Sequence, residues 1–219
     1  MVADGSTNPR VDSVRRQPIR DLDAVIRGRR SVRAFLPDVV DPQLIERAVE
    51  AAGWAPSPHG SQPWRFAIVQ DATRRHTLAA AMAETWRQQL LFDGQDAETV
   101  AHRLARSKER IETAPVIIVP CLYTADLDAY PDQHRQAAEE TMAVESLGAA
   151  IQNLLLEIYA SGLDAGWMCA PLFCPDLVRE NLGLPISLVP QALIPVGYAA
   201  KEPVRRPRRA VAELIASWE

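Results

Sequence analysis

The stretch Arg29-Arg30-Ser31-Val32-Arg33-Ala34-Phe35 is the starting point for interpreting this chain. It holds three guanidinium groups and one hydroxyl within five residues, and it follows Gly28, a typical end for the short amphipathic segment 21–27. A guanidinium group can donate two parallel hydrogen bonds to phosphate oxygens, so an arginine cluster just beyond a helix end favours an anionic cofactor. A solvated basic turn is the alternative, because runs of charge usually lie on the surface.

The composition is that of an ordinary globular protein whose positive charge is concentrated locally. The chain has 219 residues, of which 47% are hydrophobic and 24% charged, and its net charge is −4. This charge argues against a general nucleic-acid-binding protein, which needs a broad basic face to neutralise phosphates. The arginines gather instead in 27–33 and again in 205–209. This pattern predicts a small anionic ligand.

Cysteine and histidine patterns predict neither a disulfide framework nor a metal site. The three cysteines show no CxxC pair, which is typical of free thiols in a reducing compartment. The four histidines show no spacing typical of metal ligands. The N-terminal residues lack the apolar core of a secretory signal, and the longest apolar run, 114–123, is too short to span a bilayer. We therefore expect a cytoplasmic protein with no membrane segment.

Helical and strand-like segments alternate along the chain. Helix signals occur at 21–27, 42–53, 71–91, 97–112, 133–160 and 176–182, and strand signals at 64–69, 115–119, 166–170 and 191–197. Residues 1–18 are expected to form a flexible arm and residues 19–219 a single domain. The polar helix 97–112 is a candidate for a mobile flap over a site, although a plain surface hairpin of helices is the more frequent outcome.

Four landmarks, in this order, make the chain similar to the nitroreductase family of flavoproteins. They are the arginine stretch 29–35, the proline-rich loop with Ala-Pro-Ser at 55–57 and Gln-Pro-Trp at 62–64, the glycines of 162–167, and Gly197-Tyr198 followed by Arg206-Pro207-Arg208. The resemblance extends over residues 19–209. It implies a nitroreductase-like α+β fold, in which a central, mostly antiparallel sheet of four to five strands is flanked by helices. It also implies an intertwined homodimer with its sites at the subunit interface.

The resemblance implies a tightly bound FMN. Arg29 and Ser31, joined by Arg206 and Arg208 from the tail, would hold the phosphate and the ribityl chain. Arg33 would lie near the pyrimidine edge of the ring and tune the flavin. The full set of expected FMN-binding residues is Arg29, Arg30, Ser31, Arg33, Ser57, Pro58, His59, Gln62, Gly166, Trp167, Met168, Arg206 and Arg208. No catalytic side chain and no metal are expected, because the flavin performs the chemistry.

The proline-rich loop carries one departure from the family pattern. Ser57 and Pro58 would pack on the flavin that is held chiefly by the other subunit. Many members have an asparagine where this chain has His59-Gly60. A hydrogen bond from that position to the flavin therefore does not carry over, and His59 would face either the substrate or the solvent.

The expected reaction is ping-pong hydride transfer, in which a nicotinamide or deazaflavin donor and then an acceptor use the same ring face. Residues 55–66 and 165–175 are most similar to the C-terminal reductase domain of the bifunctional enzyme that matures the deazaflavin coenzyme F-420. This implies reduction of a dehydro-deazaflavin precursor. A general NAD(P)H-dependent nitro or quinone reductase and a non-catalytic flavin-binding or deazaflavin-binding protein are the alternatives. A further alternative is an enzyme that fragments its flavin or dehalogenates its substrate. The flavin-destroying branch of the family typically has aspartate where this chain has Ser31, which argues against that alternative.

Overall fold

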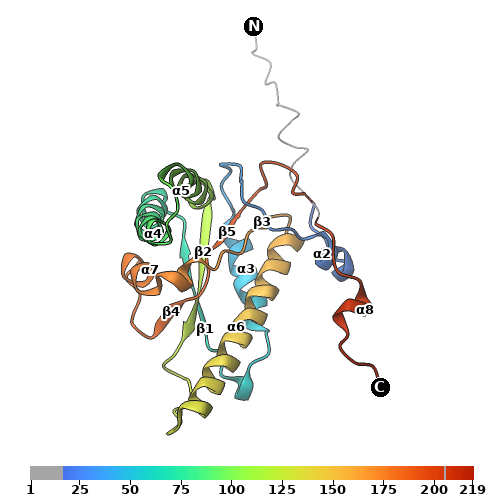
Figure 1. Ribbon diagram of the computed structural model, residues 1–219. Coiled ribbons are helices and arrows are strands. Elements are labelled where there is room, and N and C mark those ends of the chain that lie inside the picture. The colour runs from blue at the N-terminus through green and yellow to red at the C-terminus, as the bar shows by residue number, and fades with distance from the viewer. Residues whose placement is uncertain (1–16, 205) are drawn as a thin grey trace.

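The computed structural model of the protein describes residues 17–204 and 206–219 (Figure 1). Residues 1–16 of the predicted arm and Arg205 of the second arginine cluster lie outside the described residues. The predicted extent of the domain, 19–219, stays a prediction.

Five helices begin at an aspartate whose carboxylate accepts a backbone N–H of the first turn. These are α2 (Leu22–Gly28), α3 (Pro42–Gly53), α4 (Ala72–Phe92), α5 (Ala97–Glu112) and α6 (Gln133–Ala160), capped by Asp21, Asp41, Asp71, Asp96 and Asp132. Such a carboxylate satisfies a donor that the helix leaves unpaired, and it lies at the positive end of the helix dipole. Local sequence therefore determines where these helices start, and the predicted helices 42–53, 97–112 and 133–160 have the observed bounds.

The strands form one five-stranded sheet. β1 (Trp64–Val69), β2 (Val116–Tyr123), β5 (Ile194–Gly197) and β3 (Asp164–Ala165) follow in this spatial order, and β4 (Leu188–Pro190) also pairs with β2. All of these pairings are antiparallel. The predicted α+β fold with a mostly antiparallel sheet flanked by helices is therefore confirmed.

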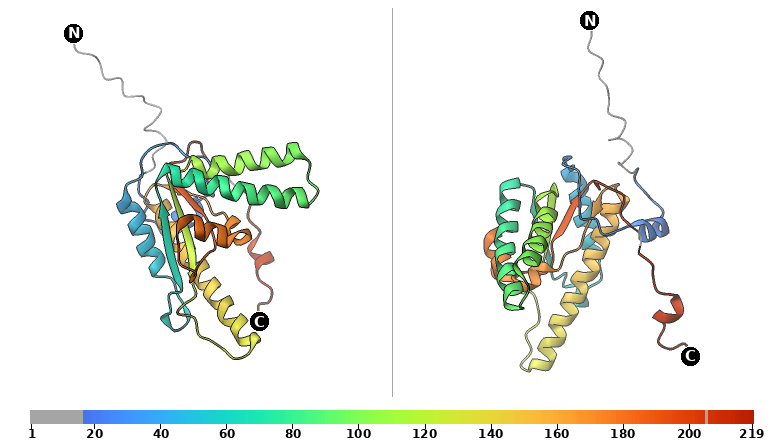
Figure 2. Two further views of the ribbon diagram at one scale, coloured as in Figure 1. Left: turned by 90° about the vertical axis from the view of Figure 1, so that its left-hand side faces the viewer. Right: turned by 45° about the horizontal axis from the view of Figure 1, so that its top comes forward.

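The sheet separates two hydrophobic cores, because successive side chains of β2 point to opposite faces. Val116 and Ile118 join the core under α3 and α6, whereas Ile117 and Val119 join the core under α4, α5 and α7 (Pro175–Leu182). Figure 2 shows α4 and α5 as a hairpin on one side of the sheet, with the long helix α6 on the other. Burial on both faces explains why this strand is an unbroken apolar run in the sequence.

The strand predictions near the C-terminus were partly wrong. The predicted strand 166–170 is instead β3 at Asp164–Ala165, followed by a short 3-10 helix, η2 (Ala170–Phe173), with only an isolated bridge at Met168. Pro171 in the first turn of η2 fixes a helical φ, which is why the segment turns instead of continuing as a strand. The last strand starts at Ile194, three residues later than predicted, and β4 was not predicted.

The C-terminal tail leaves the body of the protein. It carries a short helix, α8 (Val211–Leu214), and Figures 1 and 2 show it extending away from the sheet beyond α2. Three of its apolar side chains are largely exposed: Val211 is 71% exposed, Leu214 68% and Trp218 87%.

Candidate functional site

Three segments that are distant in the sequence meet where the arginine stretch crosses the end of the sheet. The backbone N–H of Val32 donates to the carbonyl of Ala165 at 2.9 Å, and Ser31 forms a parallel bridge with Ala165. Further along, the N–H of Leu36 donates to the carbonyl of Tyr198 at 2.8 Å. These hydrogen bonds hold the segment after α2 against β3 and against the residues that follow β5.

Gly166 permits this close approach. A Cβ atom added at this residue would lie 2.5 Å from the carbonyl oxygen of Val32, which is closer than a Cβ atom can come to a backbone oxygen. The absence of a side chain at Gly166 therefore keeps the arginine stretch tight against β3. Gly166 was predicted as a cofactor-binding residue, and the structure places it against the backbone of the arginine stretch.

The arginines of this stretch and of the tail surround a small hollow of about 210 Å³. Its walls are Arg29, Arg30, Ser31, Arg33, Val204, Arg206 and Arg208. We call it the arginine hollow. Six of the thirteen predicted site residues are thus brought together from two ends of the chain.

Arg29 is the guanidinium of the arginine hollow that most needs an anionic partner. It is partly buried, and its buried Nε has no hydrogen-bond partner among the described residues. Burial lowers its pKa, and the positive charges of Arg208 and Arg30 lower it further. A phosphate group placed here would pair the orphaned N–H and offset this repulsion.

Arg30 is less available than Arg29, because its Nη1 donates to the carbonyls of Arg27 and Arg29 at 2.6 and 2.7 Å. It contributes charge to the hollow while its guanidinium holds the C-terminal turn of α2. No hydrogen bond or ion pair of Arg33 is present among the described residues. Arg33 is exposed and lies at the edge of the arginine hollow.

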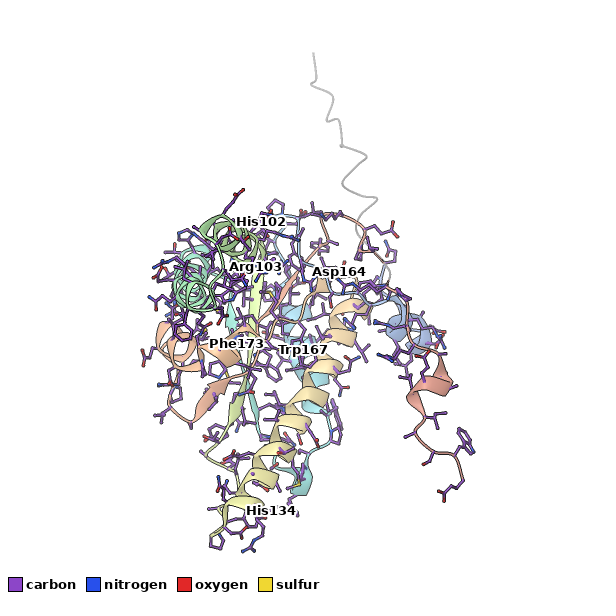
Figure 3. The ribbon with its side chains drawn as sticks, in the orientation of Figure 1. His102, Arg103, His134, Asp164, Trp167 and Phe173 are labelled. Carbon is purple, nitrogen blue, oxygen red and sulfur yellow. The ribbon has the colours of Figure 1, made fainter. Side chains whose placement is uncertain are left out.

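A second, larger hollow begins at Arg33. Its volume is about 570 Å³, and it lies between the α4–α5 hairpin and the segment 167–174. It is lined by Arg33, Met82, Thr85, Trp86, Gln89, Asp93, Ser107, Arg110, Trp167, Met168, Ala170, Phe173 and Cys174. We call it the aromatic hollow. Figure 3 shows two of its walls, Trp167 and Phe173, on the segment that crosses in front of the sheet.

Trp167 and Met168, which were predicted to bind FMN, line the aromatic hollow. The sequence prediction missed three other walls of the same hollow, Trp86, Arg110 and Phe173. Trp86 lies on α4, and Arg110 lies on the helix 97–112 that was a candidate for a mobile flap. Their neighbourhood depends on how the α4–α5 hairpin packs, for which the local sequence carries no signal.

The predicted residues of the proline-rich loop are not brought to either hollow within one chain. The loop follows α3 in the chain and forms a short 3-10 helix, η1 (Pro58–Gly60), which contacts α6. The hydroxyl of Ser57 accepts the N–H of Gln62 at 3.0 Å, and both His59 and Gln62 have positive φ, at 54° and 47°. The loop is a preformed, partly strained surface in which His59 is exposed.

Two structural absences hold for the part of the chain that is described. No group of three or more His, Cys, Asp or Glu side chains there could hold a metal ion. No helix there is both long and apolar enough to cross a bilayer.

Comparison with known proteins decides the family. The profile described as "Nitroreductase family" matches residues 26–198, which include the arginine stretch, the whole sheet and both helices of the hairpin. The chain belongs to the nitroreductase family. This membership confirms the predicted family, and with it the prediction of an FMN-dependent oxidoreductase.

Individual relatives are similar to this chain over most of its length. A 5,6-dimethylbenzimidazole synthase of Rhodospirillum rubrum is 29% identical over 83% of both chains. An NADH dehydrogenase of Thermus thermophilus is also 29% identical, over 84% of this chain and 90% of its own. Among solved structures, a BluB-like flavoprotein of Clostridium difficile superposes with a TM-score of 0.78 at 20% identity and covers 91% of this chain and 100% of its own. This last likeness concerns the fold alone.

Proposed function

We propose that the arginine hollow binds the phosphate of FMN and that the flavin ring lies toward Arg33, between the two hollows. The observation that carries this proposal is that the two hollows meet at one residue, Arg33, which lines both. The orphaned Nε of Arg29, the clustered positive charge and the side-chain-free Gly166 all suit a phosphate group with an attached chain. The chain therefore fits FMN at this place.

FMN, when bound, would supply the hydride-transfer chemistry between a donor and an acceptor. The residues of the chain have other tasks. Arg29, Arg206 and Arg208 hold the phosphate, Ser31 contacts the ribityl chain, and Arg33 places a positive charge beside the edge of the ring. The aromatic hollow admits the donor and the acceptor in turn and excludes water around them.

The proposed site needs a second copy of the chain. Ser57, Pro58, His59 and Gln62 are assigned to the flavin site, yet in one chain their loop lies beside α6 and away from both hollows. A two-fold homodimer would bring the loop of one subunit to the flavin of the other. The exposed apolar tail residues Val211, Leu214 and Trp218 suit such an exchange of contacts, because an apolar patch of this kind needs a partner surface.

The finer proposal concerns the substrates. The donor is a nicotinamide or a reduced deazaflavin, and the acceptor we place first is a dehydro-deazaflavin precursor. The resemblance of residues 55–66 and 165–175 supports this acceptor, and an aromatic hollow of about 570 Å³ is wide enough for a planar ring system. A general nitro or quinone reductase would use the same hollow. A screen of acceptors distinguishes that function from reduction of the dehydro-deazaflavin precursor.

A second candidate function is fragmentation of the flavin itself. The similarity to a 5,6-dimethylbenzimidazole synthase favours it, whereas Ser31, where aspartate is typical of flavin-destroying members, argues against it. Aerobic incubation of the reduced enzyme followed by chromatography distinguishes the two. Intact FMN at the end supports the reductase, and loss of FMN with a benzimidazole product supports fragmentation.

The first experiment is the visible absorption spectrum of the purified protein, followed by heat release and chromatography of the chromophore. We expect FMN near one per chain, and reduction of that FMN by NADH, NADPH or a reduced deazaflavin under anaerobic conditions. A colourless protein that also fails to take up added FMN would overturn the proposed cofactor site. Full flavin occupancy without reduction by any of these donors would support the non-catalytic binding protein instead.

A further inference from the structure

The aromatic hollow has a second guanidinium, besides that of Arg33, to which the proposed flavin site assigns no task. Arg110, in the last turn of α5, lines this hollow and is partly buried. Burial lowers its pKa, and the positive charges of Arg33 and Arg106 lower it further, with Glu109 acting in the opposite direction. Arg110 is therefore a cation with more positive than negative charge around it.

No acidic side chain compensates Arg110 inside the hollow. Asp93 also lines the hollow, but it forms no ion pair with Arg110 or Arg33 among the described residues. Glu109, next to Arg110 in the sequence, offsets only part of the positive charge around it. Glu112, at the end of α5, is engaged elsewhere, because it pairs with His76 at 2.7 Å and with Lys108 at 3.5 Å. A half-buried cation of this kind gains when an anionic group of a ligand enters.

The remaining walls suit an aromatic ring. Trp86 from α4 and Trp167 and Phe173 from the segment 167–174 face the same hollow as Arg110. Phe173 is 73% exposed and Trp167 37% exposed, which is costly for such large apolar rings unless a ligand covers them. Thr85, Gln89 and Ser107 add polar groups, and the side chain of Gln89 donates to the carbonyl of Phe173 at 3.4 Å, linking the hairpin to that segment.

We infer that the acceptor of this enzyme is an aromatic compound with an anionic substituent, and that Arg110 binds that substituent while the ring lies among Trp86, Trp167 and Phe173. The inference rests on the proposed function, because it uses the part of the aromatic hollow that the flavin leaves free. It makes Arg110 a specificity-determining residue. Arg33 contacts the cofactor, whereas Arg110 contacts the acceptor.

Binding of a matched pair of probes tests the inference without turnover. The probes are 2-naphthoate and its neutral analogue 2-naphthamide, and the measurement is isothermal titration of the flavin-loaded protein. We expect 2-naphthoate to bind at least about tenfold more tightly than the amide, because only the carboxylate can accept a charge-assisted hydrogen bond from Arg110 with both partners ionised. Arg110→Gln should abolish this preference while leaving the amide affinity unchanged, and Arg110→Lys should keep part of it.

Arg74→Gln is the matched control. Arg74 is an exposed arginine in the first turn of α4, and its substitution removes the same charge at a place outside the hollow. We expect it to preserve the preference for the acid. Equal binding of both probes to the wild type, or an unchanged preference in Arg110→Gln, would overturn the inference. An equal loss in Arg74→Gln would also overturn it, because the preference would then come from the general field of the protein.

Kinetics provide the second readout. The ratio of kcat/KM for 4-nitrobenzoate to that for 4-nitrobenzamide should fall about tenfold in Arg110→Gln and stay unchanged in Arg74→Gln. Failure of the proposed function is visible separately, as a protein without FMN or without donor-dependent turnover. For a protein without FMN, the same pair of probes is titrated into the flavin-free protein, because Arg110 and the aromatic side chains that line the hollow belong to the chain itself.

Discussion

Arg29 is the residue on which the proposed phosphate site most depends. Its buried Nε lacks a partner among the described residues, and burial with the nearby Arg208 and Arg30 lowers its pKa. Both facts indicate that the protein holds an uncompensated cation at the place where an anion is to be bound. Such an arrangement lowers the stability of the free protein and raises the affinity for the anion.

Replacement of Arg29 should therefore weaken binding of FMN more than binding of riboflavin, which lacks the phosphate. We expect Arg29→Gln to lose about 2 kcal/mol of FMN affinity, the size of a charge-assisted hydrogen bond, and to leave riboflavin binding unchanged. Fluorescence titration of the flavin-free protein measures both affinities. If the variant loses affinity for the two flavins equally, Arg29 supports the fold of the site instead of the phosphate.

Arg33 lies where the arginine hollow and the aromatic hollow meet, so its charge should act on the ring. Arg33→Ala should slow reduction of the bound flavin and lower its reduction potential, while FMN still binds. Anaerobic stopped-flow reduction and a potentiometric titration measure the two effects. A variant with bound FMN and normal turnover would show that Arg33 has no such role.

The cysteines differ in the reactivity that their surroundings allow. Cys121 is buried in β2, and burial raises the pKa of its thiol to about 12, whereas Cys169 is exposed. At pH 8 the raised pKa keeps the Cys121 thiol protonated, and the thiolate is the reactive form. We expect a disulfide reagent such as Ellman's to modify Cys169 in the native protein and Cys121 only after unfolding. Peptide mapping of the modified protein checks this, and rapid modification of native Cys121 would contradict it.

At the scale of elements, Gly166 is the contact between the arginine stretch and β3. In Gly166→Ala the new Cβ would meet the carbonyl oxygen of Val32 at 2.5 Å, so the two segments must separate. We expect a loss of about 1–3 kcal/mol in the free energy of unfolding and weaker FMN binding. Chemical denaturation and flavin titration measure these changes.

Gly53→Ala is the control for this substitution, because no atom lies within 4 Å of a Cβ added at Gly53. It should leave both quantities close to those of the wild type. A Gly166→Ala protein that binds FMN normally would show that the contact does not shape the site.

The α4–α5 hairpin forms one wall of the aromatic hollow, as a flap over the site would, but its mobility stays a prediction. Its ends were predicted well because Asp71 and Asp96 cap its helices and the chain turns at Asp93 and Gly94. Its position over the hollow was not predictable, because it depends on the packing of Leu78 and Met82 in the same hydrophobic core as Ile117 and Val119 of β2.

At the scale of the molecule, the exposed tail and the position of the proline-rich loop away from both hollows support the proposed homodimer. Removal of residues 210–219 should convert a dimer into a monomer or a weaker dimer, because it removes Val211, Leu214 and Trp218 from the proposed interface. FMN occupancy should fall with it. Light scattering after size-exclusion chromatography and the ratio of flavin to protein absorbance measure both. A full-length protein that is a monomer with bound FMN would contradict the dimeric site.

The sequence by itself determined the helices, the sheet class and the family. Helix starts depend on single capping residues and on periodicity, which act over a few neighbouring positions, and β2 is apolar on both faces because it is central. Only the tertiary structure decided that Gly166 supports Val32, that Arg33 lines both hollows, and that Arg110 and Trp86 line the same hollow as Trp167. Those contacts join segments from different parts of the chain, and they depend on how whole elements pack, which no local pattern encodes.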